Sequence, residues 1–128
     1  IGFGMPVAIG AAIACSNQKV ISLEGDGSAM YTVQSLWTMA RENLDIVVLI
    51  FANQSYKILQ GELNNVGVTN PGKSAIEMLS LKSPELDWVS MSKGMGVDAI
   101  RVDNIEDLVK YFKYGIKENG PFLIEVLI

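Results

Sequence analysis

The chain has 128 residues, of which 49% are hydrophobic and 19% are charged, so it can bury one core and is too apolar to be disordered. Ten Lys and Arg against 14 Asp and Glu give a net charge of −4 without a basic run, which argues against nucleic acid as a partner. The chain contains no histidine and one cysteine, which excludes His-containing catalytic triads, His-ligated zinc and an internal disulfide within these residues.

The first predicted element is a helix from Pro6 to Ala14 that is apolar almost all round, as expected of a helix buried between layers. Its apolar stretch is shorter than the roughly 20 residues that cross a bilayer, and no signal peptide precedes it, so we expect a cytoplasmic protein without membrane contact. Cys15 is expected to be a small buried thiol. Because the chain opens on Ile1 rather than an initiator Met, we interpret residues 1–128 as one domain of a longer protein.

A strand, a helix and a second strand follow. Residues 20–23 form a β-branched run that ends at Gly25-Asp26-Gly27, after which Ser28 is expected to cap a helix. The packed face of that helix is expected to hold Val33, Leu36, Trp37 and Ala40. Residues 46–52 are continuously apolar, which is typical of a strand covered on both faces of a parallel sheet. These elements predict a βαβ unit.

The second half of the chain continues the alternation. A short helix is expected to hold Ile58, Leu59, Glu62 and Leu63, whereas residues 67–84 show no sustained period and are expected to lack regular structure. Asp87 is predicted to cap a helix that ends near Gly94, before a strand at 99–102. Asn104 is predicted to cap a helix over 105–119, with Leu108, Val109, Phe112 and Ile116 packed, before a buried strand at 122–128. The alternation predicts an α/β fold with a doubly wound, mostly parallel sheet flanked by helices.

Polar residues follow two strands of this sheet at their carboxyl ends, where ligands bind in open parallel sheets. Asp26 follows the first strand and Asn53 the second, so the two side chains can face one another. Carboxylate and amide oxygens suit Mg²⁺, which commonly keeps positions for water and phosphate. Gly25 and Gly27 allow a ligand close to the backbone, and the amides that follow open a helix whose dipole favours an anion. Gly-Asp-Gly alone is usually only a turn, so the joint arrangement carries the prediction of a Mg²⁺-diphosphate site.

At this point the sequence resembles a known family. Gly25-Asp26-Gly27, followed after 25 residues by Asn53, is similar to the thiamine diphosphate motif, although its first Asn is Ala52 here. Residues 1–10, 86–97 and 120–126 resemble acetolactate synthase and benzoylformate decarboxylase. The resemblance covers nearly the whole chain and implies the thiamine diphosphate-binding fold, as the carboxyl-terminal domain of a 2-oxo acid decarboxylase-like enzyme.

The resemblance also implies roles for individual residues. The Mg²⁺ ligands would be the side chains of Asp26 and Asn53 and the backbone carbonyl of Ser55. Amides of Gly27, Ser28 and Ala29 would hold the diphosphate, and Gly25 and Tyr56 would complete the cofactor site. Ile58, Leu59 and Glu62 align with substrate-channel positions, although Ile58 and Leu59 equally suit a core. Glu62 stands where acetolactate synthases resemble one another in having Trp, which argues against their specific carboligation.

No catalytic residue is expected in this chain, because the family's activating Glu comes from another domain of a partner subunit. Its residue that enforces the bent cofactor conformation is expected before Ile1. The resemblance therefore implies missing amino-terminal domains, a homodimer or homotetramer, and decarboxylation of a 2-oxo acid with or without carboligation. The alternatives are a benzoylformate decarboxylase-like simple decarboxylase and a phosphate-binding module without turnover. The sequence leaves open the 2-oxo acid, the type of product and whether FAD is bound.

Overall fold

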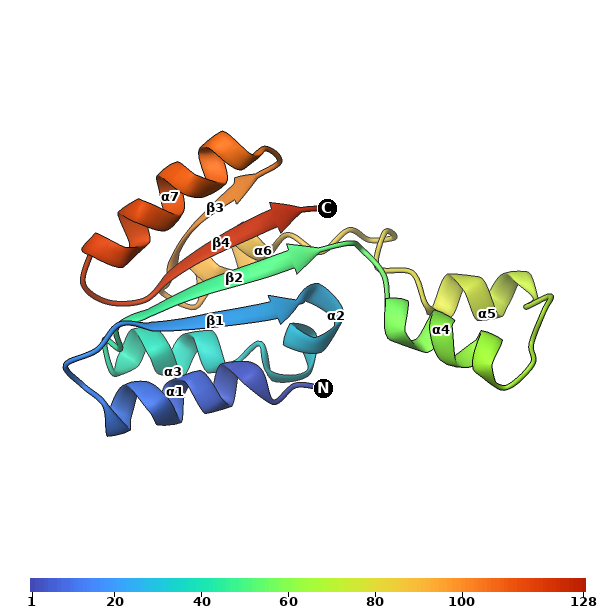
Figure 1. Ribbon diagram of the computed structural model, residues 1–128, viewed down its shortest axis with the longest axis horizontal. Coiled ribbons are helices and arrows are strands. Elements are labelled where there is room, and N and C mark those ends of the chain that lie inside the picture. Colours follow the sequence, from blue (N-terminus) through green and yellow to red (C-terminus); the bar gives the residue numbers. More distant parts are fainter.

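Four apolar runs form an all-parallel sheet in the computed structural model, which describes residues 1–128 (Figure 1). The strands are β1 (Val20–Gly25), β2 (Ile46–Ala52), β3 (Asp98–Val102) and β4 (Phe122–Leu127), in the order β1-β2-β4-β3. All strands point the same way, so their carboxyl ends lie along one edge. The predicted parallel sheet and the βαβ unit of β1 and β2 are confirmed.

Helices cover both faces of the sheet, which confirms the doubly wound class. Helices α1 (Gly4–Ala14), α3 (Ser35–Arg41) and α6 (Trp88–Gly94) lie on one face, and α7 (Ile105–Lys117) lies on the other (Figure 1). The larger core on the first face contains Met5, Leu36, Met39, Ile50, Trp88 and Leu123. The smaller core contains Val47, Leu49, Val102, Phe122, Ile124 and Val126, with Leu108 and Phe112 of α7 packed on it. Strand β2 is buried on both faces, as its sequence predicts.

The amino-terminal half corrects several expectations. Helix α1 begins at Gly4, and only one side of it is buried, so Phe3 and Cys15 are exposed. The prediction of a buried Cys15 thiol is therefore wrong, because no element covers the outer face of α1. Ser28 does not cap a helix: it lies inside α2 (Asp26–Ala29), which continues through a 3-10 turn at Met30–Thr32. Trp37 of α3 was expected on the packed face but is exposed. Met39 of the same helix is buried in the core instead.

The carboxyl-terminal caps are confirmed, whereas the packed face of α7 is partly wrong. Asp87 Oδ1 accepts a hydrogen bond from the Ser90 amide at 2.9 Å, and Asn104 Oδ1 accepts one from the Asp107 amide at 2.9 Å. Val109 and Ile116 are exposed, because α7 turns the sides bearing Tyr111 and Gly115 toward the sheet instead.

Helices α4 (Lys57–Asn65) and α5 (Lys73–Met78) form a hairpin that projects from the carboxyl edge of the sheet (Figure 1). Helix α4 confirms the predicted short helix. Helix α5 contradicts the prediction that residues 67–84 lack regular structure: its six residues bury no side chain, so no apolar period marks them. No helix of the chain combines the length and apolarity needed to cross a membrane.

Candidate functional site

Asp26 stands where β1 ends and α2 begins, and its carboxylate joins two loops. Asp26 Oδ1 accepts a hydrogen bond from the Gly27 amide at 2.8 Å, and Oδ2 accepts one from the Gln54 amide at 2.7 Å. The side chain is buried, and this burial raises the pKa of the Asp26 carboxyl, while the two amide hydrogen bonds lower it by a smaller amount. A buried carboxyl in a cleft whose pKa is raised by desolvation marks a candidate functional site.

The loop after β2 supplies the neighbouring polar groups. Asn53 Oδ1 accepts a hydrogen bond from the Ser55 amide at 3.0 Å, which fixes the side-chain oxygen beside the loop backbone. Gln54 has a φ of 55°, in the left-handed region that few non-glycine residues adopt. The Ser55 carbonyl accepts no backbone hydrogen bond in the chain. It therefore keeps both lone pairs for another partner.

These groups surround one cavity of about 170 Å³ at the carboxyl edge of the sheet. Nine of the eleven predicted site residues line it, namely Gly25, Asp26, Gly27, Ser28, Asn53, Ser55, Tyr56, Ile58 and Leu59. Ala29 does not line the cavity and is buried in the larger core. The fold thus brings Asp26 and Asn53, which are 27 positions apart in the sequence, to the same cavity.

The backbone of α2 forms one wall of the cavity, and Gly27 leaves room for Tyr56. A Cβ at Gly27 would lie 2.7 Å from Tyr56 Cδ1, so the ring sits directly against the glycine. The Gly27 amide already donates to Asp26, which leaves the Ser28 amide as the first unengaged donor of the helix end that faces the cavity. Helix α2 has four residues, so its dipole contributes less than the sequence pattern suggests.

The three predicted substrate residues separate into two groups. Ile58 and Leu59 line the cavity beside Asp26, whereas Glu62 lies on a second, apolar groove of about 360 Å³ between α4 and α5. Glu62 is exposed and accepts a hydrogen bond from Asn65 Nδ2 at 3.1 Å. Leu59 lines both spaces and connects them.

Sequence reasoning did not assign three residues that line the cavity: Ile1, Tyr31 and Lys57. Ile1 lies just before α1. Tyr31 lies in the 3-10 turn at Met30–Thr32, where the sequence predicted one continuous helix. Lys57 is exposed and brings a cation to the rim. The position of Lys57 directly after the loop of Asn53 was the available signal.

The donor set fits a magnesium ion shared with a phosphate ligand. The chain has no cluster of three or more His, Cys, Asp or Glu, so it has no closed cage for a metal ion. One carboxylate, one amide oxygen and one free carbonyl are hard donors that leave positions for ligand oxygens. The oxygens of Asp26 and Asn53 each accept one amide hydrogen bond and keep a second lone pair.

Comparison with known proteins identifies the family. The sequence profile described as "Thiamine pyrophosphate enzyme, C-terminal TPP binding domain" matches residues 1–126. The chain belongs to this family. A protein of Mycobacterium tuberculosis that carries the provisional name of an acetolactate synthase large subunit is 44% identical over the whole chain. Benzoylformate decarboxylase of Pseudomonas aeruginosa is 34% identical over 98% of the chain.

Solved structures of thiamine diphosphate enzymes share the fold. The thiamine diphosphate-dependent 4-hydroxybenzoylformate decarboxylase of Rhodococcus jostii matches 98% of this chain with a TM-score of 0.86 and 34% identity. The chain spans 25% of the Mycobacterium tuberculosis relative, 22% of the Pseudomonas aeruginosa enzyme and 22% of the Rhodococcus jostii structure. This domain of the thiamine diphosphate family therefore corresponds to about a quarter or less of each relative.

Proposed function

We propose that this domain binds the Mg²⁺-diphosphate end of thiamine diphosphate in an acetolactate synthase-like enzyme that decarboxylates a 2-oxo acid. The observation that carries the proposal is the meeting of Asp26, Asn53 and Ser55 around one cavity at the ends of adjacent strands. Membership of the thiamine pyrophosphate family supports the cofactor, and the oxygen donor set supports Mg²⁺. The bound cofactor would supply the electron sink for loss of carbon dioxide.

In this proposal the chain holds and orients the cofactor. Asp26, Asn53 and the carbonyl of Ser55 ligate the metal ion, and the amides of Gly27, Ser28 and Ala29 are assigned to the diphosphate. Two observations refine this set: the Gly27 amide donates to Asp26, and Ala29 is buried in the larger core and does not line the cavity. The Ser28 amide is accordingly the main backbone donor. Gly25 lets the ligand approach the backbone, and the ring of Tyr56 limits the cavity beside Gly27.

Apolar side chains shape the part of the cavity away from the metal ligands. Ile1, Ile58 and Leu59 line it, and we assign Ile58 and Leu59 to the substrate side. The resemblance implies that the residue that bends the cofactor lies before Ile1, and Ile1 is itself a large apolar side chain on this cavity. We assign Ile1 the contact with the cofactor rings, and Glu62 the outer rim of the substrate channel.

A simple decarboxylase of an aromatic 2-oxo acid is the second candidate. The observation in its favour is the likeness of fold and sequence to the 4-hydroxybenzoylformate decarboxylase of Rhodococcus jostii, together with the absence of Trp at Glu62. The Mycobacterium tuberculosis relative, at 44% identity, favours the acetolactate synthase-like assignment. A binding module without turnover is the third alternative.

The remaining parts of the site would come from outside these residues. We propose that residues 1–128 are the carboxyl-terminal domain of a longer chain, and that an activating Glu reaches the cofactor from another domain of a partner subunit. This arrangement requires a homodimer or homotetramer. Asp26 is the one acid that lines the cavity, and the proposal assigns it to the metal ion.

Product analysis of the full-length protein tests this proposal. Pyruvate and benzoylformate are supplied separately with thiamine diphosphate and Mg²⁺, and aldehydes and hydroxy-ketones are quantified. We expect cofactor-dependent release of carbon dioxide from at least one substrate. Benzaldehyde from benzoylformate, with no turnover of pyruvate, would favour the simple decarboxylase. No release from either substrate despite bound cofactor would favour the binding module.

A further inference from the structure

The loop that carries Asn53 and Ser55 is held in an unfavourable backbone conformation. Gln54, between them, has its φ at 55°, which costs a residue with a Cβ about 1 kcal/mol or more. Its backbone is held at both ends: its amide donates to Asp26 Oδ2 at 2.7 Å, and its carbonyl accepts from the Leu81 amide at 2.9 Å. Such a conformation persists only when neighbouring contacts hold it.

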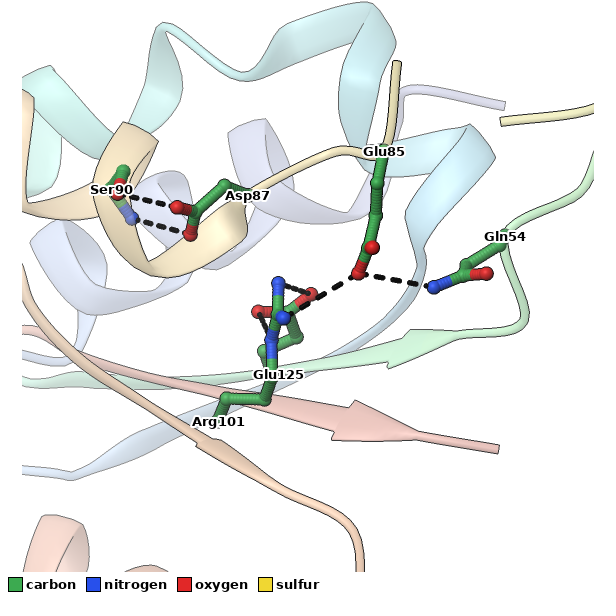
Figure 2. A network of polar contacts seen from close by, with 6 residues as sticks. All are labelled: Gln54, Glu85, Asp87, Ser90, Arg101 and Glu125. Atoms are coloured by element: carbon green, nitrogen blue, oxygen red, sulfur yellow. Dashed lines mark hydrogen bonds and ion pairs between the residues drawn. The ribbon is translucent and has the colours of Figure 1, made fainter. Parts of the chain in front are cut away.

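The side chain of Gln54 adds a third contact, which leads out of the site. Gln54 Nε2 donates to Glu85 Oε1 at 3.2 Å, and the same oxygen lies 3.4 Å from Arg101 Nη1 (Figure 2). Glu85 precedes α6, and Arg101 lies on β3, an edge strand that β4 separates from β2. Glu85 therefore connects the loop after β2 to this edge strand. One oxygen of Glu85 thus accepts a hydrogen bond from Gln54 and forms an ion pair with Arg101.

The far end of this chain of contacts is fixed inside the sheet. Arg101 and Glu125 are register partners on β3 and β4, and Glu125 is 1% exposed. Arg101 Nε donates to Glu125 Oε2 at 2.8 Å, and Nη2 donates to Oε1 at 3.2 Å, a two-point contact that holds the guanidinium in one orientation (Figure 2). Burial raises the pKa of the Glu125 carboxyl, and the Arg101 contact opposes this rise.

We propose that Gln54, Glu85 and Arg101, anchored on Glu125, form a brace that holds the loop 53–55 in its metal-binding conformation. This inference rests on the proposed function, because it concerns the residues that would ligate Mg²⁺. Glu85 is a positioning residue in the brace: it touches neither metal nor cofactor, and it acts through the backbone of Gln54. An isolated surface ion pair contributes little, but this pair joins a rigid strand to a strained loop.

The test uses the full-length protein and substitutes Glu85, whose side chain is half exposed, so that the fold is preserved. Mg²⁺ is titrated calorimetrically at saturating thiamine diphosphate, and amide hydrogen exchange of residues 53–56 is measured without ligand. Loss of one hydrogen-bonded contact predicts that Glu85→Ala raises the apparent Kd for Mg²⁺ about three- to tenfold. The same variant should accelerate exchange of the loop amides.

Three further variants make the test specific. Glu85→Gln keeps one oxygen that can accept from Gln54 and face Arg101, so it should restore the apparent Kd to within about twofold. In the Gln54→Ala background, Glu85→Ala should have no further effect, because the contact is already absent. The matched control is Glu42→Ala, which removes an ion pair of similar exposure (44% against 48%) at the end of α3 and should change neither readout.

The outcomes separate the brace from the proposed function. A Glu85→Ala variant with wild-type Mg²⁺ affinity and loop exchange would overturn the brace. So would a variant that only lowers Tm, or a Glu85→Gln variant as weak as Glu85→Ala. A wild-type protein that binds thiamine diphosphate without Mg²⁺ would instead overturn the proposed function. In that case amide hydrogen exchange, which needs no ligand, would be the remaining test of the brace.

Discussion

Two glycines two positions apart make different demands on the candidate site. Gly25 has a φ of −83° and no atom within 4 Å of a Cβ built on it, so the folded chain accepts Ala at this position. A Cβ at Gly27 meets the ring of Tyr56 at 2.7 Å. The first glycine is therefore free of a structural requirement within these residues, whereas the second is needed to seat an aromatic ring.

This difference yields a paired prediction. Gly27→Ala should destabilise the protein by about 1 to 3 kcal/mol, as overpacking does, and weaken thiamine diphosphate binding. Gly25→Ala should leave the free energy of unfolding within about 0.5 kcal/mol of the wild type, yet weaken cofactor binding because the diphosphate approaches that backbone. Denaturant unfolding and calorimetry measure the two effects. Wild-type cofactor affinity in Gly25→Ala would place the diphosphate away from Gly25.

Glu62 gives a prediction about acceptor choice. Its carboxylate lies one helical turn from Ile58 and on the apolar groove that Leu59 shares with the main cavity. Repulsion of a second anionic 2-oxo acid, on the order of 1 kcal/mol, predicts that Glu62→Gln raises the ratio of carboligation to decarboxylation about fivefold. Glu62→Trp should act in the same direction. An unchanged product ratio in both variants would show that Glu62 is a surface charge without influence on the substrate.

At the scale of elements, one carboxylate ties the amino ends of three strands together. Asp45 precedes β2 and accepts from Lys19 Nζ at 3.0 Å and from the Gly120 amide at 2.6 Å. Lys19 also donates to the Glu118 carbonyl, before β4. These contacts lower the pKa of Asp45, with the Lys19 hydrogen bond as the largest cause.

The sign of this shift predicts a pH dependence of stability. A lowered folded-state pKa means that Asp45 stabilises the fold above its unfolded-state pKa of about 3.9, and that this contribution is lost as the pH falls through the folded-state value. Asp45→Asn should therefore lower Tm at pH 7, and the difference should shrink below pH 4. The control is Asp98→Asn, at an exposed carboxylate without an ion pair. Equal Tm values for wild type and Asp45→Asn at pH 7 would contradict this role.

Elements were predictable where local sequence carried the structural cause. The seven apolar residues of β2 and the caps Asp87 and Asn104 are local signals, and the structure follows them. Helix α5 buries no side chain, so its sequence has no apolar period from which a helix could be predicted. Nine of the predicted cofactor and substrate residues share a cavity because strand ends in a parallel sheet converge, a rule that sequence alone supports. The Gln54 to Glu125 contacts depend on the register of β3 and β4 and could not be foreseen.

At the scale of the whole molecule, several large apolar side chains remain exposed. They include Phe3 before α1, Ile13 on α1 and Leu23 on β1, as well as Val66 and Met78 on the α4–α5 hairpin. Exposed apolar groups of this kind favour association. The 128-residue chain produced alone should self-associate in sedimentation experiments, and it should not decarboxylate any 2-oxo acid. Turnover by the isolated chain would contradict a site completed by other domains.

The most direct test of the central claim is calorimetric binding of thiamine diphosphate to the full-length protein at limiting Mg²⁺. Asp26 is the only acid on the cavity, so Asp26→Ala removes the sole charged metal ligand that the chain offers. The account predicts Mg²⁺-dependent binding by the wild type, a loss of affinity of at least about tenfold in Asp26→Ala, and wild-type binding by Glu42→Ala. Equal affinity of Asp26→Ala and wild type at limiting Mg²⁺ would contradict it.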